Sequence, residues 1–173
     1  MRSDTLAVPR AFADSQYALG MARARALEAA SAPLDAEREY RALVGDFAGL
    51  RPAADAAARL AALARDPALV RARARRAALA RRVYAHRDAL GRFVDELRRS
   101  PDGSVRPATL QALGTEALLA EARDTADPEG AQAAARMLAT QRVALSDLGE
   151  EMTRAGRPAH AETAYRAARL ARP

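Results

Sequence analysis

The sequence predicts an all-α protein of about seven antiparallel helices, and three observations carry this prediction. Alanine, the strongest helix former, supplies 48 of the 173 residues and loses no side-chain entropy when it is ordered. Residues that favour strands are scarce, since isoleucine and tryptophan are absent and valine occurs seven times. Nine prolines separate the alanine-rich runs, and proline is tolerated in the first turn of a helix but breaks its interior.

The first third of the chain predicts a helical hairpin, residues 12–50, followed by a third helix. We expect the first helix over residues 14–30, the second from Pro33 to about Phe47, and the third from Pro52 to about Arg65. Apolar residues at helical spacing mark the faces that these helices bury. They are Tyr17, Met21, Ala24, Leu34, Tyr40, Leu43, Val44, Ala56, Leu60 and Leu63.

The central segment predicts one long helix over about 67–99, with Asp66 as its N-cap. Steps of three and four residues make a seam of helical packing positions. The seam consists of Leu69, Ala72, Arg76, Leu79, Val83, His86, Leu90, Phe93 and Leu97. The alternative is two shorter helices that meet near His86.

The last third predicts three helices, over about 108–125, from Pro128 to a C-cap at Gly156, and over 158–170. Their expected buried positions are Leu110, Leu113, Ala117, Leu118, Ala134, Leu138, Leu145, Leu148 and Met152. We expect one domain, residues 1–173, made of the hairpin 12–50, central helices 51–99 and C-terminal helices 108–173.

Residues 145–173 resemble a tetratricopeptide repeat, a pair of helices with small residues where they cross. The positions that carry the resemblance are Leu148, Gly149, Met152, Gly156, Ala161, Tyr165, Ala168 and Pro173. Met152 stands where the family usually has tyrosine. Gly149, Ala161 and Ala168 would leave room for the neighbouring helix, and Tyr165 would fill the remaining gap.

Residues 17–48 resemble the same repeat more weakly. Ala24, Ala36, Tyr40 and Leu43 repeat the spacing of small, aromatic and apolar residues, but the turn at 31–33 lacks the family's glycine. Tyr40 and Tyr165 are 125 residues apart, which is not a multiple of the ~34-residue period. The resemblance therefore implies repeat-like hairpins at both ends with an irregular helical insert, and it implies protein or peptide binding on a concave helical surface.

Basic charge gathers in the middle of the chain. Residues 51–100 hold 13 arginines and 5 acidic residues, a net charge of +8. Arg71, Arg75 and Arg82 share one helical stripe, whereas Arg73 and Arg81 lie elsewhere around the circumference. This pattern favours a solvated face over an acidic partner or nucleic acid, and we expect no aromatic stacking platform beside it.

Composition and motifs favour a non-enzyme without cofactor or metal. Cysteine and lysine are absent, which excludes thiolate chemistry, disulfides and the lysine of a phosphate-binding loop. His86 and His160 have no partner at metal-ligand spacing; we expect His86 in the seam or at a helix break and His160 on an exposed side. The neighbouring carboxylates Glu37/Glu39 and Glu150/Glu151 are expected to be surface charges paired with arginine.

The sequence thus predicts a non-catalytic interaction or scaffold module with a protein or peptide partner. An arginine-rich nucleic-acid binder and a C-terminal helical appendage of a larger multidomain enzyme are the alternatives. No signal peptide follows Met1–Asp4, and no stretch is long and apolar enough to span a membrane, so we expect a cytoplasmic protein. The joint absence of isoleucine, lysine and asparagine is typical of a GC-rich bacterial genome.

Overall fold

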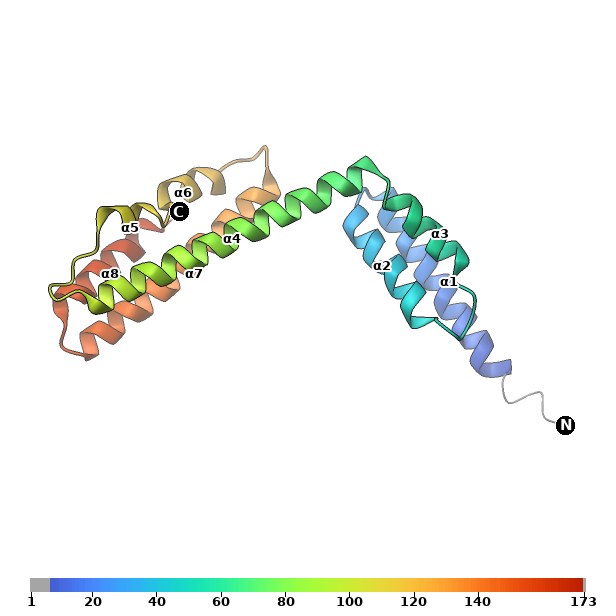
Figure 1. Cartoon of the computed structure of the whole chain (residues 1–173), viewed down its shortest axis with the longest axis horizontal. Helices are drawn as coiled ribbons and strands as arrows, with labels where there is room; N and C mark the ends of the chain where they lie inside the picture. Colours follow the sequence, from blue (N-terminus) through green and yellow to red (C-terminus); the bar gives the residue numbers. More distant parts are fainter. Residues whose placement is uncertain (1–6, 173) are drawn as a thin grey trace. The chain divides into compact units, whose positions relative to one another are not determined.

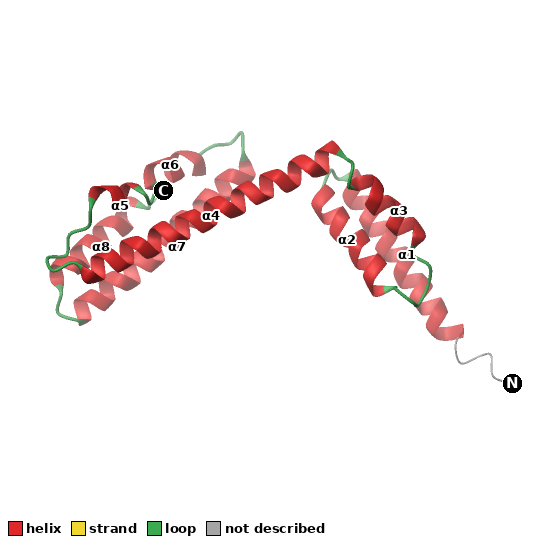
Figure 2. Cartoon of the chain, in the orientation of Figure 1, coloured by secondary structure: helices red, strands yellow, loops and turns green. Residues whose placement is uncertain are grey.

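The computed structural model of the chain describes residues 7–172, with side chains from residue 10. Within this range the chain forms eight helices, α1 (Ala7–Ala29), α2 (Pro33–Asp46), α3 (Ala54–Leu63), α4 (Pro67–Arg99), α5 (Pro107–Gln111), α6 (Thr115–Ala122), α7 (Pro128–Arg154) and α8 (Pro158–Leu170) (Figure 1). Figure 2 shows only helices, turns and loops in this part of the chain, which confirms the all-α prediction. Met1–Asp4 and Pro173, on which two sequence expectations rest, lie outside the described residues.

Prolines set the beginnings of five of these helices, α2, α4, α5, α7 and α8. A backbone N–H in the first turn of a helix has no partner within that helix, so proline, which lacks this group, loses no hydrogen bond there. Asp66 accepts a hydrogen bond from the Ala68 backbone N–H at 2.7 Å, and Asp127 accepts one from Gly130 at 3.0 Å. Both carboxylates therefore cap a helix that starts at a proline, as the sequence predicted for Asp66.

The long central helix is continuous from Pro67 to Arg99, so the alternative of a break near His86 is wrong. The predicted seam holds only at the two ends of α4, where Leu69, Leu90, Phe93 and Leu97 are buried. In the middle, Arg76 and Val83 are exposed and His86 is half-buried. The reason is that only the two ends of α4 reach a hydrophobic core. None of the buried residues of the three cores lies within residues 70–88.

The predicted helix over 108–125 is wrong, because two short helices, α5 and α6, stand in its place. Gly114 separates them with a left-handed backbone, φ 62°, which ends a helix and which glycine adopts without strain. The break changes which side chains face inward. Leu113 and Leu118 are buried as expected, but Leu110 is 40% exposed and Ala117 is exposed.

The tertiary contacts divide the chain into two compact units, with the boundary between Ala77 and Ala78 inside α4. The single domain of residues 1–173 that we expect from the sequence stays a prediction. In the N-terminal unit α2 contacts both α1 and α3. Its core consists of Tyr17, Met21, Ala24, Ala36, Tyr40, Leu43, Ala56, Leu63 and Leu69.

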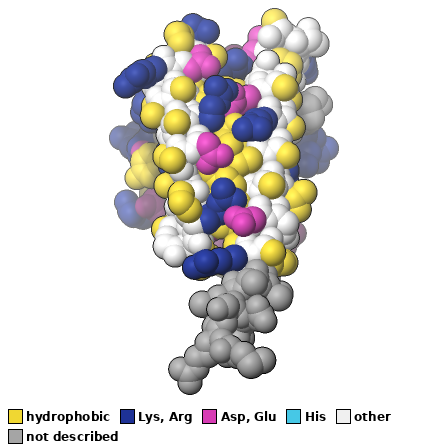
Figure 3. Space-filling view, turned by 90° about the vertical axis from the view of Figure 1, so that its right-hand side faces the viewer, with side chains coloured by type: hydrophobic (Ala, Val, Ile, Leu, Met, Phe, Trp, Pro, Cys, Tyr) yellow, Lys and Arg dark blue, Asp and Glu magenta, His cyan; other side chains and the backbone are white. Residues whose placement is uncertain are grey.

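Helix α3 covers one face of the α1–α2 hairpin through apolar contacts and polar pairs. Tyr17 donates a hydrogen bond to Asp55, and its hydroxyl accepts one from the Ala56 backbone N–H at 3.3 Å. Glu28 of α1 forms an ion pair with Arg59 of α3. Figure 3 shows a face of the molecule where acidic and basic side chains alternate along a strip of hydrophobic ones.

The C-terminal unit centres on α7 and α8, which contact each other extensively. Its main core joins the end of α4 to this hairpin, and it consists of Leu90, Phe93, Leu97, Leu113, Leu145, Leu148, Met152, Ala161, Ala164, Ala167 and Ala168. A smaller core of Leu118, Ala134, Met137, Leu138 and Ala171 lies between α6, α7 and the end of α8. Alanine supplies most of the α8 contribution, so this helix lies close to its neighbours.

Candidate functional site

The predicted arginine stripe is partly neutralised. Arg82 forms an ion pair with Glu121, and this hydrogen bond raises the pKa of Arg82. Arg71 and Arg75 are both exposed, and Arg71 lies at the rim of a hollow that Ser31, Leu63 and Asp66 also line. The three residues therefore do not form one set of equivalent cations.

An exposed tyrosine that the sequence analysis did not single out lies near the arginines of α4. The Tyr84 side chain is 75% exposed. It stands three residues from Arg81 and three residues from Arg87, the spacing of neighbours on one helical face, and both arginines are exposed. Sequence periodicity missed Tyr84 because it lies outside the predicted seam.

The α7–α8 hairpin has the packing that the sequence predicted for its small and aromatic positions. Gly149 lies directly against the Tyr165 ring, since a Cβ built at Gly149 would come within 2.5 Å of Tyr165 Cε1. Ala161 and Ala168 are buried on α8. Gly156 makes the turn with φ 68°, and the Arg157 N–H donates to the Met152 carbonyl at 2.9 Å, which is a Schellman motif.

The α1–α2 hairpin matches α7–α8 helix for helix when the sequence is shifted by 125 residues. The matching pairs are Ala24 and Gly149, Ala29 and Arg154, Ser31 and Gly156, Pro33 and Pro158, Ala36 and Ala161, and Tyr40 and Tyr165. Ser31 also has a left-handed backbone, φ 57°, and the Ala32 N–H donates to the Leu27 carbonyl at 2.9 Å. The N-terminal turn therefore has the same Schellman geometry without the glycine.

A groove runs between α7 and α8 on the face that holds Tyr165, and we call it the α7–α8 groove. Its lining residues are Arg142, Val143, Ser146, Asp147, Tyr165, Ala168, Arg169 and Arg172, and its volume is about 620 Å³. Val143 is 56% exposed, and Tyr165 is half-buried. Exposed apolar and aromatic side chains flanked by charges are typical of a surface that binds a protein.

The charges of the α7–α8 groove have no partner in the described part of the chain. Arg142, Arg169, Arg172 and Asp147 are all exposed, and within residues 7–172 none of their side chains makes an ion pair or a hydrogen bond to another residue. Three arginines face one aspartate, so the groove carries a net charge of +2.

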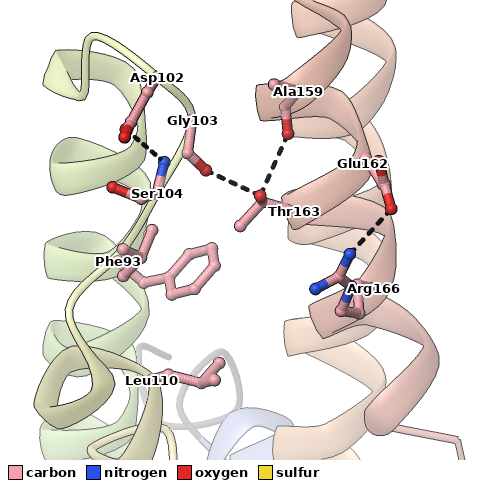
Figure 4. Close-up of a pocket in the computed structure, with 10 residues that line it drawn as sticks. Phe93, Asp102, Gly103, Ser104, Leu110, Ala159, Glu162, Thr163 and Arg166 are labelled. Atoms are coloured by element: carbon pink, nitrogen blue, oxygen red, sulfur yellow. Dashed lines mark hydrogen bonds and ion pairs between the residues drawn. The ribbon is translucent and has the colours of Figure 1, made fainter.

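A second hollow, of about 420 Å³, lies on another side of α8, and we call it the loop hollow (Figure 4). The loop between α4 and α5 forms one wall, where the Thr163 hydroxyl of α8 donates to the Gly103 carbonyl at 2.7 Å. Glu162 and Arg166 form an ion pair of 2.8 Å at its rim. Hydrogen bonds from Ser104 lower the pKa of the Asp102 carboxyl to about 2. The charged groups at the loop hollow thus already have ion-pair or hydrogen-bond partners within the chain.

His160 fixes the same loop and is buried, so its expected exposure is wrong. Its Nε2 atom lies 2.8 Å from the Ser100 carbonyl oxygen, and Arg157 donates to the Arg98 and Ser100 carbonyls at 3.0 and 2.9 Å. Gly103 lies so close to α8 that a Cβ there would meet the His160 backbone nitrogen at 2.7 Å. The Gly103 turn is what brings the loop onto His160.

The carboxylates predicted as surface charges divide into two kinds. The Glu151 side chain is about half exposed and forms an ion pair of 2.7 Å with Arg98. Glu37 instead is buried, and its carboxylate accepts hydrogen bonds from Arg41 and Arg73, which lowers its pKa with the Arg73 hydrogen bond as the main cause. Among the described residues, no three acidic or histidine side chains are grouped to hold a metal ion.

Comparison of the chain with protein-family models, with curated proteins and with solved structures finds no match. No helix in residues 7–172 combines the length and apolar character needed to cross a membrane.

Proposed function

We propose that the protein is a non-catalytic interaction or scaffold module of tetratricopeptide-like type, and that the α7–α8 groove binds a segment of a partner protein. One observation carries the proposal: the groove combines exposed Val143 and half-buried Tyr165 with charges that have no partner within the described chain. Aromatic residues and arginine are enriched in the parts of protein interfaces that contribute most affinity.

The repeated hairpin register supports the proposal. The two hairpins have small, aromatic and turn residues at equivalent positions, and in this they resemble the helix pairs that helical-repeat scaffolds stack. The buried residues of α8 are nearly all alanine, which gives this helix a packing role and leaves recognition to its exposed side chains.

Peptide display tests the proposal. Random 16-residue peptides are selected on the full chain, and their affinities are then measured for Val143→Asp and for the matched control Val70→Asp, since Val70 is similarly exposed at 52%. We expect Val143→Asp to weaken most selected peptides about tenfold, a cost typical of an interface residue, and Val70→Asp to leave them unchanged. Equal binding by both variants would show that the groove is not the binding surface.

A second candidate function, nucleic-acid binding by α4, is favoured by exposed Tyr84 between Arg81 and Arg87. A base that stacks on an aromatic ring gains roughly 1–3 kcal/mol. Fluorescence titration with single-stranded and duplex oligonucleotides at two salt concentrations tests it. Binding that falls steeply with salt, and that Tyr84→Ala weakens more for single strands, would support this candidate; no binding at low salt would remove it.

A further inference from the structure

We infer that the α7–α8 groove accepts an acidic amphipathic helix of a partner protein, in the way that the α1–α2 hairpin accepts α3. This inference rests on the proposed function and specifies the chemistry of the partner. It draws on three observations: the equivalence of the two hairpins, the composition of the groove, and the state of its charges.

The equivalence shows which kind of element fits the groove. The 125-residue shift that aligns the hairpins also aligns the lining of the α7–α8 groove with residues of the N-terminal core. Arg142, Ser146, Tyr165 and Ala168 of the groove correspond to Tyr17, Met21, Tyr40 and Leu43. In the N-terminal unit these residues share one core with Ala56 and Leu63 of α3. The α7–α8 groove thus lies at the counterpart of a face that α3 covers. There Arg142 is exposed and Tyr165 is half-buried, whereas Ala168 belongs to the C-terminal core.

The shape of the groove agrees with a helix as its occupant. On α8 the lining residue Tyr165 lies three and four residues before Ala168 and Arg169, which places them on one side of the helix. Arg172 follows just beyond the end of the helix at Leu170. α8 has 13 residues, a length of about 20 Å. A partner helix of about three to four turns would match the length of α8, with its apolar side on exposed Val143 and half-buried Tyr165.

The charges of the groove select an acidic helix. In the N-terminal unit Asp55 of α3 accepts the hydrogen bond of Tyr17, and the counterpart of Tyr17 is Arg142. A carboxylate at the equivalent point of a partner helix would meet a guanidinium, a stronger hydrogen-bond donor. Arg169 on α8, and Arg172 just beyond the end of that helix, would attract further carboxylates of the partner. A second copy of a chain with net charge +6 is a poorer match for these arginines.

The loop hollow on another side of α8 shows why the α7–α8 groove is the better site. Arg166 at the loop hollow is already paired with Glu162, so a partner carboxylate there would have to compete for it. Arg142 and Arg169 have no such competitor among the described residues. Asp147 and the exposed Val143 side chain also make the groove a poor fit for a bare polyanion.

Synthetic peptides based on α3 test the inference with the full chain. The probe is a 16-residue peptide with the sequence of residues 51–66 in which the three arginines are replaced by glutamate, held helical by a hydrocarbon staple because isolated helices of this length are marginal. The matched control carries glutamine at the same three places. Fluorescence anisotropy is measured at two salt concentrations, and polyglutamate and a single-stranded oligonucleotide serve as competitors.

We expect the glutamate peptide to bind about tenfold more tightly than the glutamine peptide, with an advantage that shrinks at high salt. Arg142→Ala and Arg169→Ala should each weaken it about threefold to fivefold, within the range of exposed ion pairs. Arg136→Ala is the matched control, because Arg136 is exposed on α7 but lies six residues, about one and two-thirds turns, before Arg142 and therefore on a different side of the helix. Circular dichroism and melting curves verify that each variant is folded.

The outcomes separate the inference from the proposed function. Equal binding of both peptides, lost in Val143→Asp, would overturn the acidic partner and leave the groove as a protein-binding site. Competition by polyglutamate or the oligonucleotide as strong as by the glutamate peptide would also overturn it, since the groove would then be a general anion surface. Failure of both peptides to bind overturns the inference, and the display selection with Val143→Asp then decides the proposed function separately.

Discussion

The α1–α2 and α7–α8 hairpins share one register but differ in what their common face contacts. In the N-terminal unit that face carries Tyr17 and Leu43 and is covered by α3. In the C-terminal unit the corresponding residues Arg142 and Ala168 both line a groove, but only Arg142 is exposed, whereas Ala168 stays in the core. The comparison teaches that register and turn geometry define the hairpin, whereas the residues on its outer face decide whether it becomes core or surface.

The largest effect should come from a charge placed where the two helices of a hairpin touch. Ala161 and its counterpart Ala36 are both buried, 5% and 0% exposed. Ala161→Arg and Ala36→Arg should each destabilise their hairpin by about 3 kcal/mol, because the arginine buries an unpaired charge or displaces a helix. Thermal unfolding followed by circular dichroism measures this, and an unshifted melting curve for Ala161→Arg would contradict the packing of α8.

The next effect distinguishes two equivalent ion pairs. Glu37–Arg41 and Glu162–Arg166 correspond under the 125-residue shift, but the glutamate side chain is 7% exposed in the first pair and 67% in the second. Glu37→Gln should cost about 2 kcal/mol, since charge-assisted hydrogen bonds from Arg73 and Arg41 are lost. Glu162→Gln should cost less than about 0.5 kcal/mol. Urea unfolding of the two variants measures the difference, and equal costs would contradict the burial of Glu37.

The same pair predicts a pH dependence. The pKa of Glu37 is lower in the folded protein than its ordinary value of 4.5, so its contribution to stability is complete above that value. The contribution is lost as the pH falls through the lowered pKa, because protonation of the folded state then removes the pairing. The stability gap between the unmodified chain and Glu37→Gln should therefore narrow between neutral and strongly acidic pH, and a constant gap would contradict this role.

A smaller effect tests the closeness of the helices. Gly149→Ala should cost about 1–2 kcal/mol, because the new Cβ would lie within 2.5 Å of the Tyr165 ring and overpacking carries a cost of this order. The counterpart position already holds Ala24, fully buried, so the N-terminal hairpin has room for that Cβ. Differential scanning calorimetry measures the change. If Gly149→Ala were instead more stable, the higher helix propensity of alanine would have met no opposing clash, and this would contradict the close approach of Tyr165 to Gly149.

The smallest effect concerns the two turns. Ser31 and its counterpart Gly156 both have a left-handed backbone conformation, but only Gly156 is a glycine. Ser31→Gly should stabilise the N-terminal hairpin by up to about 1 kcal/mol, and Gly156→Ser should destabilise the C-terminal one by a similar amount, because a Cβ strains this conformation. The two melting temperatures should move in opposite directions, and a shift in the same direction would contradict the shared turn geometry.

Much of the fold could be predicted from the sequence, because proline positions and alanine runs act locally. α8 begins and ends as predicted, at Pro158 and Leu170. Periodicity failed where the outcome depends on distant contacts. Periodicity predicts that Val83 lies in the seam, but no hydrophobic core reaches this residue. It also predicts that His160 is exposed, because it cannot anticipate that the loop around Gly103, far away in the sequence, covers this side chain.

The candidate site was predicted only in part. Tyr165 and Ala168 were identified as packing positions, but Arg142, Val143 and Arg169 were missed, since each is an ordinary exposed helix residue when taken alone. A usable signal existed in the 125-residue correspondence. Where one hairpin has a core residue such as Tyr17 and the other has Arg142, the second hairpin exposes the equivalent face.

Mapping the binding site residue by residue tests the central claim most directly. ¹H–¹⁵N spectra of the full chain are recorded during titration with the glutamate peptide. The account predicts shifts concentrated in residues 142–147 and 165–172, with residues 14–28 of the covered hairpin unchanged. Shifts concentrated on residues 71–87 of α4, or spread without preference over the arginines of the chain, would contradict it.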